Sequence, residues 1–149
     1  MAAFQLDKTL SENGSVSRGI CEQNSNELVT VVETHDIKKN SAGIIECDRD
    51  ISLLGSELVS MNMWGFTPTL FDHLEKMFND FLTGNISDLK SEFLIPSVIN
   101  DLIEKNIEKV KVLKTQSTWF GVTYVEDKAF VESQIKELIQ SGEYPVSLF

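Results

Sequence analysis

The hydrophobic pattern changes its period near residue 67, and this change most strongly limits what the chain can fold into. Before this point, apolar residues occur in short strand-like runs that are separated by turn signals. After it, apolar residues recur at the three- and four-residue spacing of amphipathic helices. Strands followed by helices that alternate with further strands predict an α/β fold, in which helices cover a mixed sheet.

Six strands are expected in the first half of the chain, in the runs AFQL, SRGICE, ELVTVVET, AGIIEC, ISLL and ELVSMNMWGF. Turn residues separate them, such as Asn13-Gly14, Asn24-Ser25-Asn26 and Asp48-Arg49-Asp50. Two more strands, KVKVL and TWFGV, are expected in the second half. Lysine alternates with valine in KVKVL, which predicts a strand with one solvated face.

Three helices are expected in the second half. The first runs from Pro68 to about Leu82 with Thr67 as its cap, and the second runs from about Pro96 to Asn106, after a shorter helical turn near SDLKSEFL. The third begins near Glu126 and Asp127, since carboxylates are favourable at a helix N-terminus.

One face of each helix is apolar and is expected to pack on the core. These faces are Leu74, Met77, Phe78 and Phe81 in the first helix, Val98, Ile99, Leu102 and Ile103 in the second, and Phe130, Val131, Ile135, Leu138 and Ile139 in the third. If Phe78 is in the core, replacing it by alanine should cost about 3–5 kcal/mol.

The composition predicts one soluble domain that spans residues 1–149. No apolar run approaches the roughly 20 residues needed to cross a bilayer, so we expect no membrane association. The N-terminal residues have neither a basic region nor a long apolar region of a secretory signal, which predicts a cytoplasmic protein. The two cysteines, Cys21 and Cys47, are expected to be reduced and inert.

The charge and the motifs exclude several functional classes. A formal net charge of −10 disfavours nucleic-acid binding, which depends on clustered lysine and arginine. The sequence has no phosphate-binding Gly-x-x-x-x-Gly-Lys loop, no Gly-x-Ser-x-Gly elbow and no His-Glu-x-x-His pair. Its two histidines, His35 and His73, are not spaced with other ligands to form a zinc site.

Three positions in the strand-like runs are unusual. Gly19 lies inside a run, where glycine weakens a sheet unless a ligand or another backbone approaches closely. Glu33 follows the apolar run LVTVV, and Asn62 lies in a run expected to be buried, where an unpaired amide would cost about 1–3 kcal/mol. Each residue is also compatible with a structural role, but open α/β sheets bind ligands at strand ends, so the three together predict a binding site.

Three segments carry a resemblance to a known family: SRGICEQNSNELVTVVETHD, SMNMWGFTPTLFDHLEKMFNDFL and TWFGVTYVEDKAFVESQIKEL. In order and spacing they resemble the glycine-containing strand, the Val-Glu-Lys strand, the Asn-x-Gly strand and the closing Trp-x-Asp-x-Gly-Thr-Pro-Glu-Asp segment of bacterial sugar-1-phosphate nucleotidyltransferases. These enzymes join a nucleoside triphosphate to a sugar phosphate. The resemblance extends over nearly all of the chain and is greatest for a subgroup with Ser-Met-Asn-Met-Trp-Gly-Phe.

This resemblance implies a sugar-phosphate site formed by Gly19, Glu33 and Asn62. In the family, the glycine strand offers a backbone amide to the sugar, the glutamate accepts hydrogen bonds from sugar hydroxyls, and the asparagine binds a further hydroxyl. Asn62 would then face the sugar-phosphate pocket. The alternative is a structural Asn62 that is bonded to a neighbouring loop.

The sequence also departs from the family pattern. Thr34 stands where the family has a lysine that grips the sugar phosphate, and Gly121 stands where it has a metal-binding aspartate. The family's glycine-rich triphosphate loop, with its arginine, lysine and first aspartate for Mg²⁺, has no counterpart in this sequence. The resemblance therefore implies the carboxyl-terminal half of a catalytic domain, with a partial Rossmann-like sheet of the nucleotide-diphospho-sugar transferase type.

Two functions follow as hypotheses. The first is the sugar-binding half of a nucleotidyltransferase, which is inactive alone, has no catalytic residue of its own, and holds no Mg²⁺ although the complete enzyme uses it. Its partners would be a sugar phosphate and the missing amino-terminal half. The second is a non-catalytic binding or assembly module, which pairs with another chain or a second copy through an exposed sheet edge.

Overall fold

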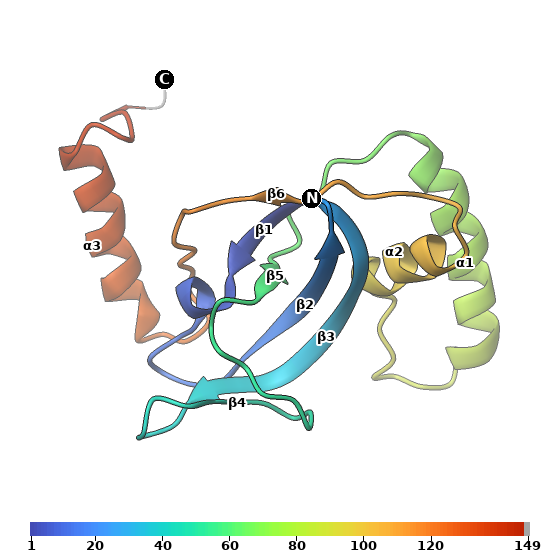
Figure 1. Ribbon diagram of the computed structural model, residues 1–149, viewed down its shortest axis with the longest axis horizontal. Helices are drawn as coiled ribbons and strands as arrows, with labels where there is room; N and C mark the ends of the chain where they lie inside the picture. Colours follow the sequence, from blue (N-terminus) through green and yellow to red (C-terminus); the bar gives the residue numbers. More distant parts are fainter. Residues whose placement is uncertain (148–149) are drawn as a thin grey trace.

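Residues 1–147 form a mixed α/β fold, with one six-stranded sheet and three α-helices (Figure 1). A computed structural model of the chain describes residues 1–147. In chain order the elements are β1 (Ala2–Gln5), the short 3₁₀ helix η1 (Leu6–Thr9), β2 (Val16–Asn24), β3 (Glu27–Lys39), β4 (Ile45–Glu46), β5 (Leu58–Ser60), α1 (Thr69–Asn85), α2 (Ile95–Glu104), β6 (Leu113–Lys114) and α3 (Asp127–Gln140).

The sheet has the strand order β4-β3-β2-β5-β1-β6. Only β1 and β6 run parallel, and the other neighbours are antiparallel. β2 and β3 are the longest strands, and they form a long curved hairpin (Figure 1). Its turn is the predicted Asn-Ser-Asn segment, in which Ser25 and Asn26 have φ values of 51° and 65°. Two successive left-handed residues suit a tight hairpin turn, because they match the twist of the flanking strands.

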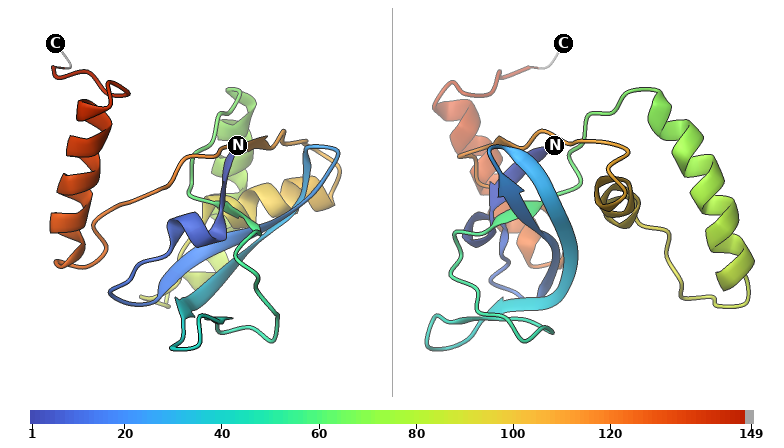
Figure 2. Two further views of the ribbon diagram at one scale, coloured as in Figure 1. Left: turned by 60° about the vertical axis from the view of Figure 1, so that its left-hand side comes forward. Right: turned by 45° about the vertical axis from the view of Figure 1, so that its right-hand side comes forward.

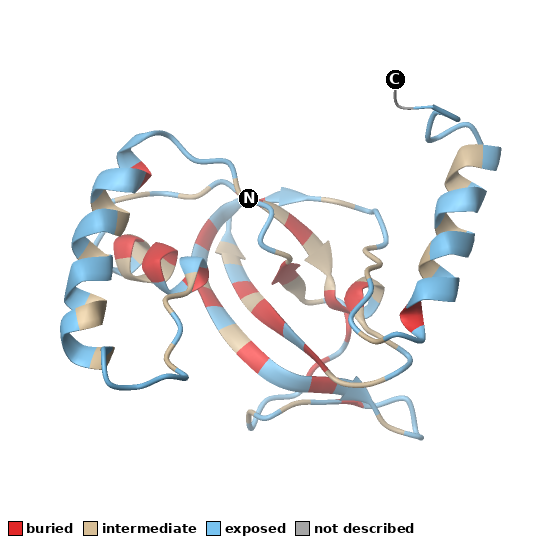
Figure 3. Ribbon diagram, turned by 180° about the vertical axis from the view of Figure 1, so that it is seen from behind, coloured by how far each residue is buried: buried red, intermediate tan, exposed pale blue. Residues whose placement is uncertain are grey.

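The core has two parts, one on each face of the sheet. On one face, sheet residues such as Ala3, Cys21 and Val31 form a cluster with the buried side of α2. On the other face, a second cluster is closed by η1, β4 and the loop after β4; its buried members are Leu6, Val16, Ile37, Ile45, Leu53 and Val59. Figure 3 shows the buried positions concentrated on the strands and on α2.

Helix α2 covers the sheet as predicted. Val98, Ile99 and Leu102 are 1–3% exposed, and Ile103 is half-buried. Asn100 fixes the helix on the edge of β3, because its Oδ1 accepts hydrogen bonds from the Thr30 hydroxyl (2.9 Å) and the Val31 N–H (3.0 Å).

Helices α1 and α3 were expected to pack on the sheet, but both lie away from it (Figure 2). In α1 only Leu70 is buried, and Phe78 is 44% exposed, so the expectation that Phe78 lies in the core is wrong. Phe78 instead packs with Phe81 and Phe93, at ring-centre distances of 6.3 and 5.3 Å. In α3 the only buried residue is Asp127, so the expected apolar face of α3 is not buried in the core.

Several predicted boundaries are also wrong. The run ISLL contributes only a single bridge between Leu53 and Ile45, and ELVSMNMWGF is a strand only from Leu58 to Ser60. The run TWFGV is not a strand, and SDLKSEFL contains turns but no helix. Thr67 does not cap α1, since its hydroxyl bonds to the Thr69 hydroxyl at 2.7 Å.

The run KVKVL is not a strand over its whole length as predicted, since β6 begins only at Leu113 and Lys111 forms an isolated bridge with Glu27. The run does show the predicted alternation, because Val112 is 2% exposed while Lys109 and Lys111 are exposed. Both cysteines are free thiols. Burial raises the pKa of Cys21 to about 12, so this thiol is not a nucleophile near neutral pH. Among residues 1–147, no helix combines the length and the apolar character that crossing a membrane requires.

Candidate functional site

Gly19 lies at the centre of the sheet, in β2 between β3 and β5. It is paired with Glu33 on one side and with Ser60 on the other. Residues that are paired across neighbouring strands point to the same face of a sheet. Glu33, Gly19 and Ser60 therefore form one row on one face, and we call them the Gly19 row.

The neighbours of Gly19 in this row leave no room for a side chain at residue 19. A Cβ at residue 19 would lie 2.9 Å from Val31 Cγ2, 3.3 Å from Ser60 Cβ and 3.6 Å from Glu33 Oε2. The Val31 N–H donates to Asn100 and therefore points away from β2. In an antiparallel pair, every second residue of a strand points its backbone groups in the same direction, so the N–H and C=O of Glu33 also point away from β2, and those of its partner Gly19 point toward β5. Gly19 therefore permits the close packing of its neighbours and does not offer a free N–H at this position.

Glu33 brings a carboxylate to the position beside Gly19. It is half-buried, and within residues 1–147 no group donates a hydrogen bond to its carboxylate. The pKa of Arg18 is lowered mainly by burial, and the nearby Glu33 charge acts on Arg18 in the opposite direction. A half-buried carboxylate without donors can accept hydrogen bonds from a ligand.

Glu33 does not lie at a strand end, which corrects the sequence prediction. Strand β3 continues past Glu33 to Lys39, because it stays paired with β2 at Thr34 and Ile37 and with β4 at Lys38 and Lys39. Glu33 therefore projects from the middle of a strand, next to Gly19. The strand-end position holds only for Asn62.

Asn62 is exposed and follows β5 by two residues, so the expectation of a buried strand at this position is wrong. It has a left-handed backbone, with φ of 55°, and asparagine tolerates this conformation better than most residues. Its N–H donates to Ser60 Oγ at 3.1 Å, and its Oδ1 accepts from Trp64 Nε1 at 3.3 Å. The Asn62 side chain thus has a local partner, while its position next to Ser60 places it beside the Gly19 row.

Ser60 is the residue that sequence reasoning missed. It is 6% exposed, pairs with Gly19, and accepts the bond from the Asn62 N–H. A signal was available, since Ser60 precedes Asn62 by two positions and strand residues alternate between faces. The structure brings Gly19, Glu33 and Ser60 into one row. That a sugar binds at Gly19, Glu33 and Asn62 stays a prediction.

The opposite face at this level is cationic. Arg18 is paired with Thr34 across β2 and β3, and both are buried. Arg18 donates to the carbonyl oxygens of Thr9 and Ser17 and to the Thr9 hydroxyl, and its guanidinium lies 5.0 Å from the centre of the Trp119 ring. This buried charge therefore holds η1, the sheet and the segment before α3 together.

Gly121, at the position of the family's metal-binding aspartate, cannot carry a side chain without moving Trp119. A Cβ there would lie 2.6 Å from Trp119 Cη2. Within residues 1–147, no three His, Cys, Asp or Glu side chains are grouped as metal ligands would be. His35 is exposed and its Nδ1 lies 2.9 Å from Ser17 Oγ. The described residues therefore do not fit a Mg²⁺ site of the kind expected in the complete family enzymes.

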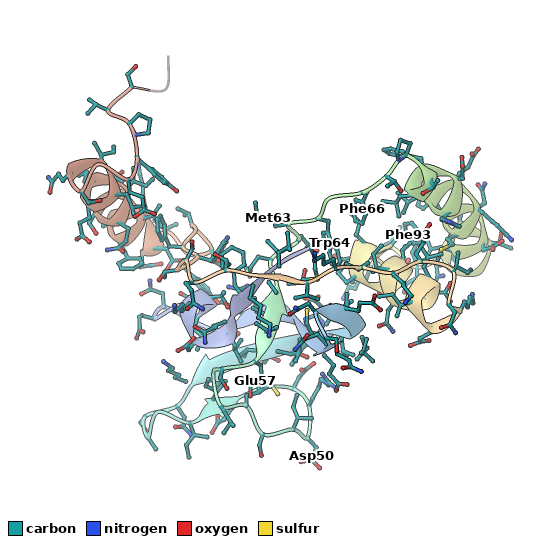
Figure 4. All side chains as sticks on the ribbon, turned by 45° about the horizontal axis from the view of Figure 1, so that its top comes forward. Asp50, Glu57, Met63, Trp64, Phe66 and Phe93 are labelled. Atoms are coloured by element: carbon teal, nitrogen blue, oxygen red, sulfur yellow. The ribbon has the colours of Figure 1, made fainter. Side chains whose placement is uncertain are left out.

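A cavity of about 460 Å³ lies between α2 and the segment from β5 to α1. Its walls include Trp64 and Phe66, whose rings stack with centres 5.8 Å apart. Figure 4 shows these two residues on the segment that leads to α1. Neither the Gly19 row nor Asn62 is part of its wall, so this cavity and the predicted site are separate features.

Comparison of the sequence with known protein families and with curated proteins gives no match. The geometry of the Gly19 row therefore carries the functional argument.

Proposed function

We propose that this chain is the sugar-phosphate-binding half of a cytoplasmic nucleotidyltransferase domain, whose sheet is a partial Rossmann-like sheet. In the whole reaction, a sugar phosphate and a nucleoside triphosphate give a nucleotide sugar and pyrophosphate. This chain would bind and orient the sugar phosphate. Since its residues do not fit a Mg²⁺ site, no step at a metal is assigned to it.

The observation that supports this proposal is the unoccupied hydrogen-bonding capacity of Glu33 beside a residue without a side chain. Sugar rings present several hydroxyl donors, and a carboxylate can accept hydrogen bonds from two neighbouring hydroxyls, one at each oxygen. Ser60 pairs with Gly19 on the side opposite Glu33 and offers a hydroxyl in the same row. The order and spacing of the three family-like segments agree with the same site.

The test is a titration of the ¹⁵N-labelled chain with a panel of hexose 1-phosphates, followed by NMR. We expect amide shifts in β2, β3 and β5 that saturate. The variant Glu33→Gln removes one charge and should weaken binding at least about tenfold, which corresponds to about 1.4 kcal/mol. Asn62→Gly removes the amide but keeps the left-handed backbone, and should also weaken binding.

The matched control is Glu22→Gln, which removes a charge from an exposed glutamate of β2. It should leave the affinity unchanged. If no hexose 1-phosphate shifts these strands at millimolar concentration, or if Glu22→Gln and Glu33→Gln weaken binding equally, the proposal is wrong.

A second candidate is an assembly module, and the exposed apolar side chains of α1 and α3 favour it. Phe71 and Phe130 are 70% and 54% exposed. Sheet-edge pairing has less support, because β4 and β6 have two residues each and short, charged edges disfavour pairing. Sedimentation velocity between about 10 and 200 μM tests whether the chain associates with itself through these helices. If it does, Phe71→Glu should abolish the association.

A further inference from the structure

Arg49 contacts the strand residue that follows Glu33. It lies in the loop between β4 and β5, and its Nη1 donates to Thr34 Oγ1 at 2.9 Å. Thr34 is fully buried and is paired with Arg18 of the neighbouring strand β2. The loop is fixed at this point, because the Asp48 N–H donates to the His35 carbonyl and Asp48 Oδ1 accepts from the His35 N–H, at 3.0 and 2.9 Å.

Within the described chain, no carboxylate lies within salt-bridge distance of Arg49. One of its neighbours, Asp48, is occupied by the His35 N–H, and the other, Asp50, lies at the outer end of the loop (Figure 4). Apart from the bond to Thr34, the guanidinium makes no hydrogen bond to the described residues. Arg49 is half-buried, so it presents a partly desolvated charge with several unused donors.

The backbone beside Arg49 adds a further donor at the free edge of β3. Val31 and His35 donate their N–H groups outward, to Asn100 and Asp48. The antiparallel alternation therefore directs the Glu33 N–H to the same edge, between these two. Strand β4 pairs with β3 only at Lys38 and Lys39, so it does not cover this position.

We propose that Arg49, together with the outward N–H of Glu33, binds a phosphoryl group at the free edge of β3. Arginine suits this ligand because its planar fork matches the oxygens of a phosphate. Arg18, the other arginine of the chain, cannot serve, because its guanidinium is committed to Thr9, Ser17 and Trp119. The same chemistry occurs in a sugar phosphate and in free phosphate, and the assignment to the sugar phosphate rests on the proposed function.

The position of Arg49 agrees with a shared ligand. Glu33 and Thr34 are consecutive in β3, so their side chains point to opposite faces, and the free edge is the route between them. A sugar phosphate would place its hydroxyls at the Glu33 carboxylate and its phosphate around the edge, at Arg49. Asp48 and Asp50 oppose an anion there, so Asp50→Asn should tighten phosphate binding.

The experiment titrates the intact chain with three probes: inorganic phosphate, a hexose 1-phosphate and the free hexose. The signals followed are the Arg49 Nε–H and the Glu33 amide. We expect phosphate and hexose 1-phosphate to shift both signals. Arg49→Gln should weaken both ligands about tenfold or more and leave the free hexose unchanged, and Arg49→Lys should retain part of the affinity because it keeps the charge but not the fork.

The control is Lys38→Gln, which removes an exposed positive charge from the same strand. Equal loss of phosphate affinity in Lys38→Gln and Arg49→Gln would show general charge attraction and overturn the proposal. No phosphate shift at Arg49 would also overturn it. A native-like spectrum of Arg49→Gln establishes that the variant is folded, and Arg49→Lys provides the second variant if it is not.

The probes separate this proposal from the proposed function. If phosphate binds at Arg49 but hexose 1-phosphate binds no more tightly and Glu33→Gln has no effect, the sugar site is wrong and Arg49 is a site for free phosphate. If hexose 1-phosphate binding depends on Glu33 but not on Arg49, the sugar site stands and the role of Arg49 is wrong.

Discussion

Gly19 fits the centre of the sheet because a side chain there would collide with its neighbours. A Cβ at residue 19 would lie only 2.9 Å from Val31 Cγ2, and the side chains of Ser60 and Glu33 lie at 3.3 and 3.6 Å from the same position. The residue therefore has a structural requirement that is independent of any ligand, and the requirement can be measured.

We predict that Gly19→Ala lowers the free energy of unfolding by about 1–3 kcal/mol, because the added methyl overpacks the sheet. Urea unfolding followed by circular dichroism measures this change. The control is Gly84→Ala in α1, where a Cβ meets nothing within 4 Å. Alanine in that helix should stabilise by about 0.5–1 kcal/mol. Similar effects of the two substitutions would contradict the packing around Gly19.

Asp127 is the residue that fixes the start of α3. Its carboxylate accepts bonds from the N–H groups of Tyr124 (2.8 Å) and Thr123 (3.0 Å), and from the side chains of Asn13 (2.7 Å) and Ser11 (3.1 Å). These bonds, with that from Tyr124 largest, lower the pKa of Asp127 below its usual value of 3.8.

A lowered pKa in the folded state gives a stability term that is present at neutral pH and lost in acid. It is complete above the pKa of the unfolded chain and disappears as the pH falls through the lower pKa of the folded chain. We predict that Asp127→Asn destabilises the chain at about pH 7, and that the difference from wild type shrinks below about pH 4. Urea midpoints at several pH values measure this.

Asp80→Asn is the control for this pH series, since Asp80 is exposed on α1 and makes no hydrogen bond to the described residues. Its urea midpoint should follow that of wild type across the series. A difference between Asp127→Asn and wild type that is independent of pH would contradict the role of the Asp127 charge.

At the scale of elements, α1 and α2 differ although both are amphipathic. Helix α2 packs on β3 through residues that are almost fully buried, whereas α1 contacts the core through Leu70, Leu74 and Met77 near its first half. Figures 1 and 3 show α1 outside α2, with most of its surface exposed. The two helices should therefore contribute differently to stability.

We predict that Phe78→Ala costs only about 1–2 kcal/mol, below the 3–5 kcal/mol typical of a core phenylalanine, because Phe78 is 44% exposed and loses mainly ring contacts. Leu102→Ala in α2 should cost about 2–5 kcal/mol, since Leu102 is 2% exposed. Chemical denaturation of both variants gives the comparison. A larger effect for Phe78→Ala would show that α1 is buried in solution, as it would be in an oligomer.

At the scale of the whole molecule, the proposed function predicts that the chain alone does not make nucleotide sugars. Phosphoryl transfer depends on neutralising the charge of the triphosphate, and the net charge of −10 works against this. Loss of several contacts of a few kcal/mol each would lower the rate by many orders of magnitude.

Pyrophosphate release measures this activity, with the purified chain, Mg²⁺, each nucleoside triphosphate and a panel of hexose 1-phosphates. We expect no release above the background without protein. Turnover near about 1 per second, within the usual range for enzymes, would overturn the assignment as a binding half.

The sequence by itself determined the type and order of most elements. Strand-like runs and helical periodicity were sufficient for β1, β2, β3 and the three helices, because local hydrophobic spacing reflects local backbone geometry. The same spacing placed Val98, Ile99 and Leu102 of α2 in the core, and it located the hairpin turn at Asn24-Ser25-Asn26. It also singled out Gly19 as a position inside a strand.

Only the tertiary structure decided which apolar faces are covered and which residues meet. Phe78, Phe130 and Leu102 each belong to an apolar face with helical spacing. Such a face is buried only where another part of the molecule packs on it, and the periodicity of the sequence does not show where this happens. The pairing of Gly19 with Glu33 was hidden because it depends on the register between strands, and the pairing with Ser60 depends on β5 lying next to β2. The contact of Arg49 with Thr34 was hidden for the same physical reason, since a loop can meet any strand that the fold brings to it.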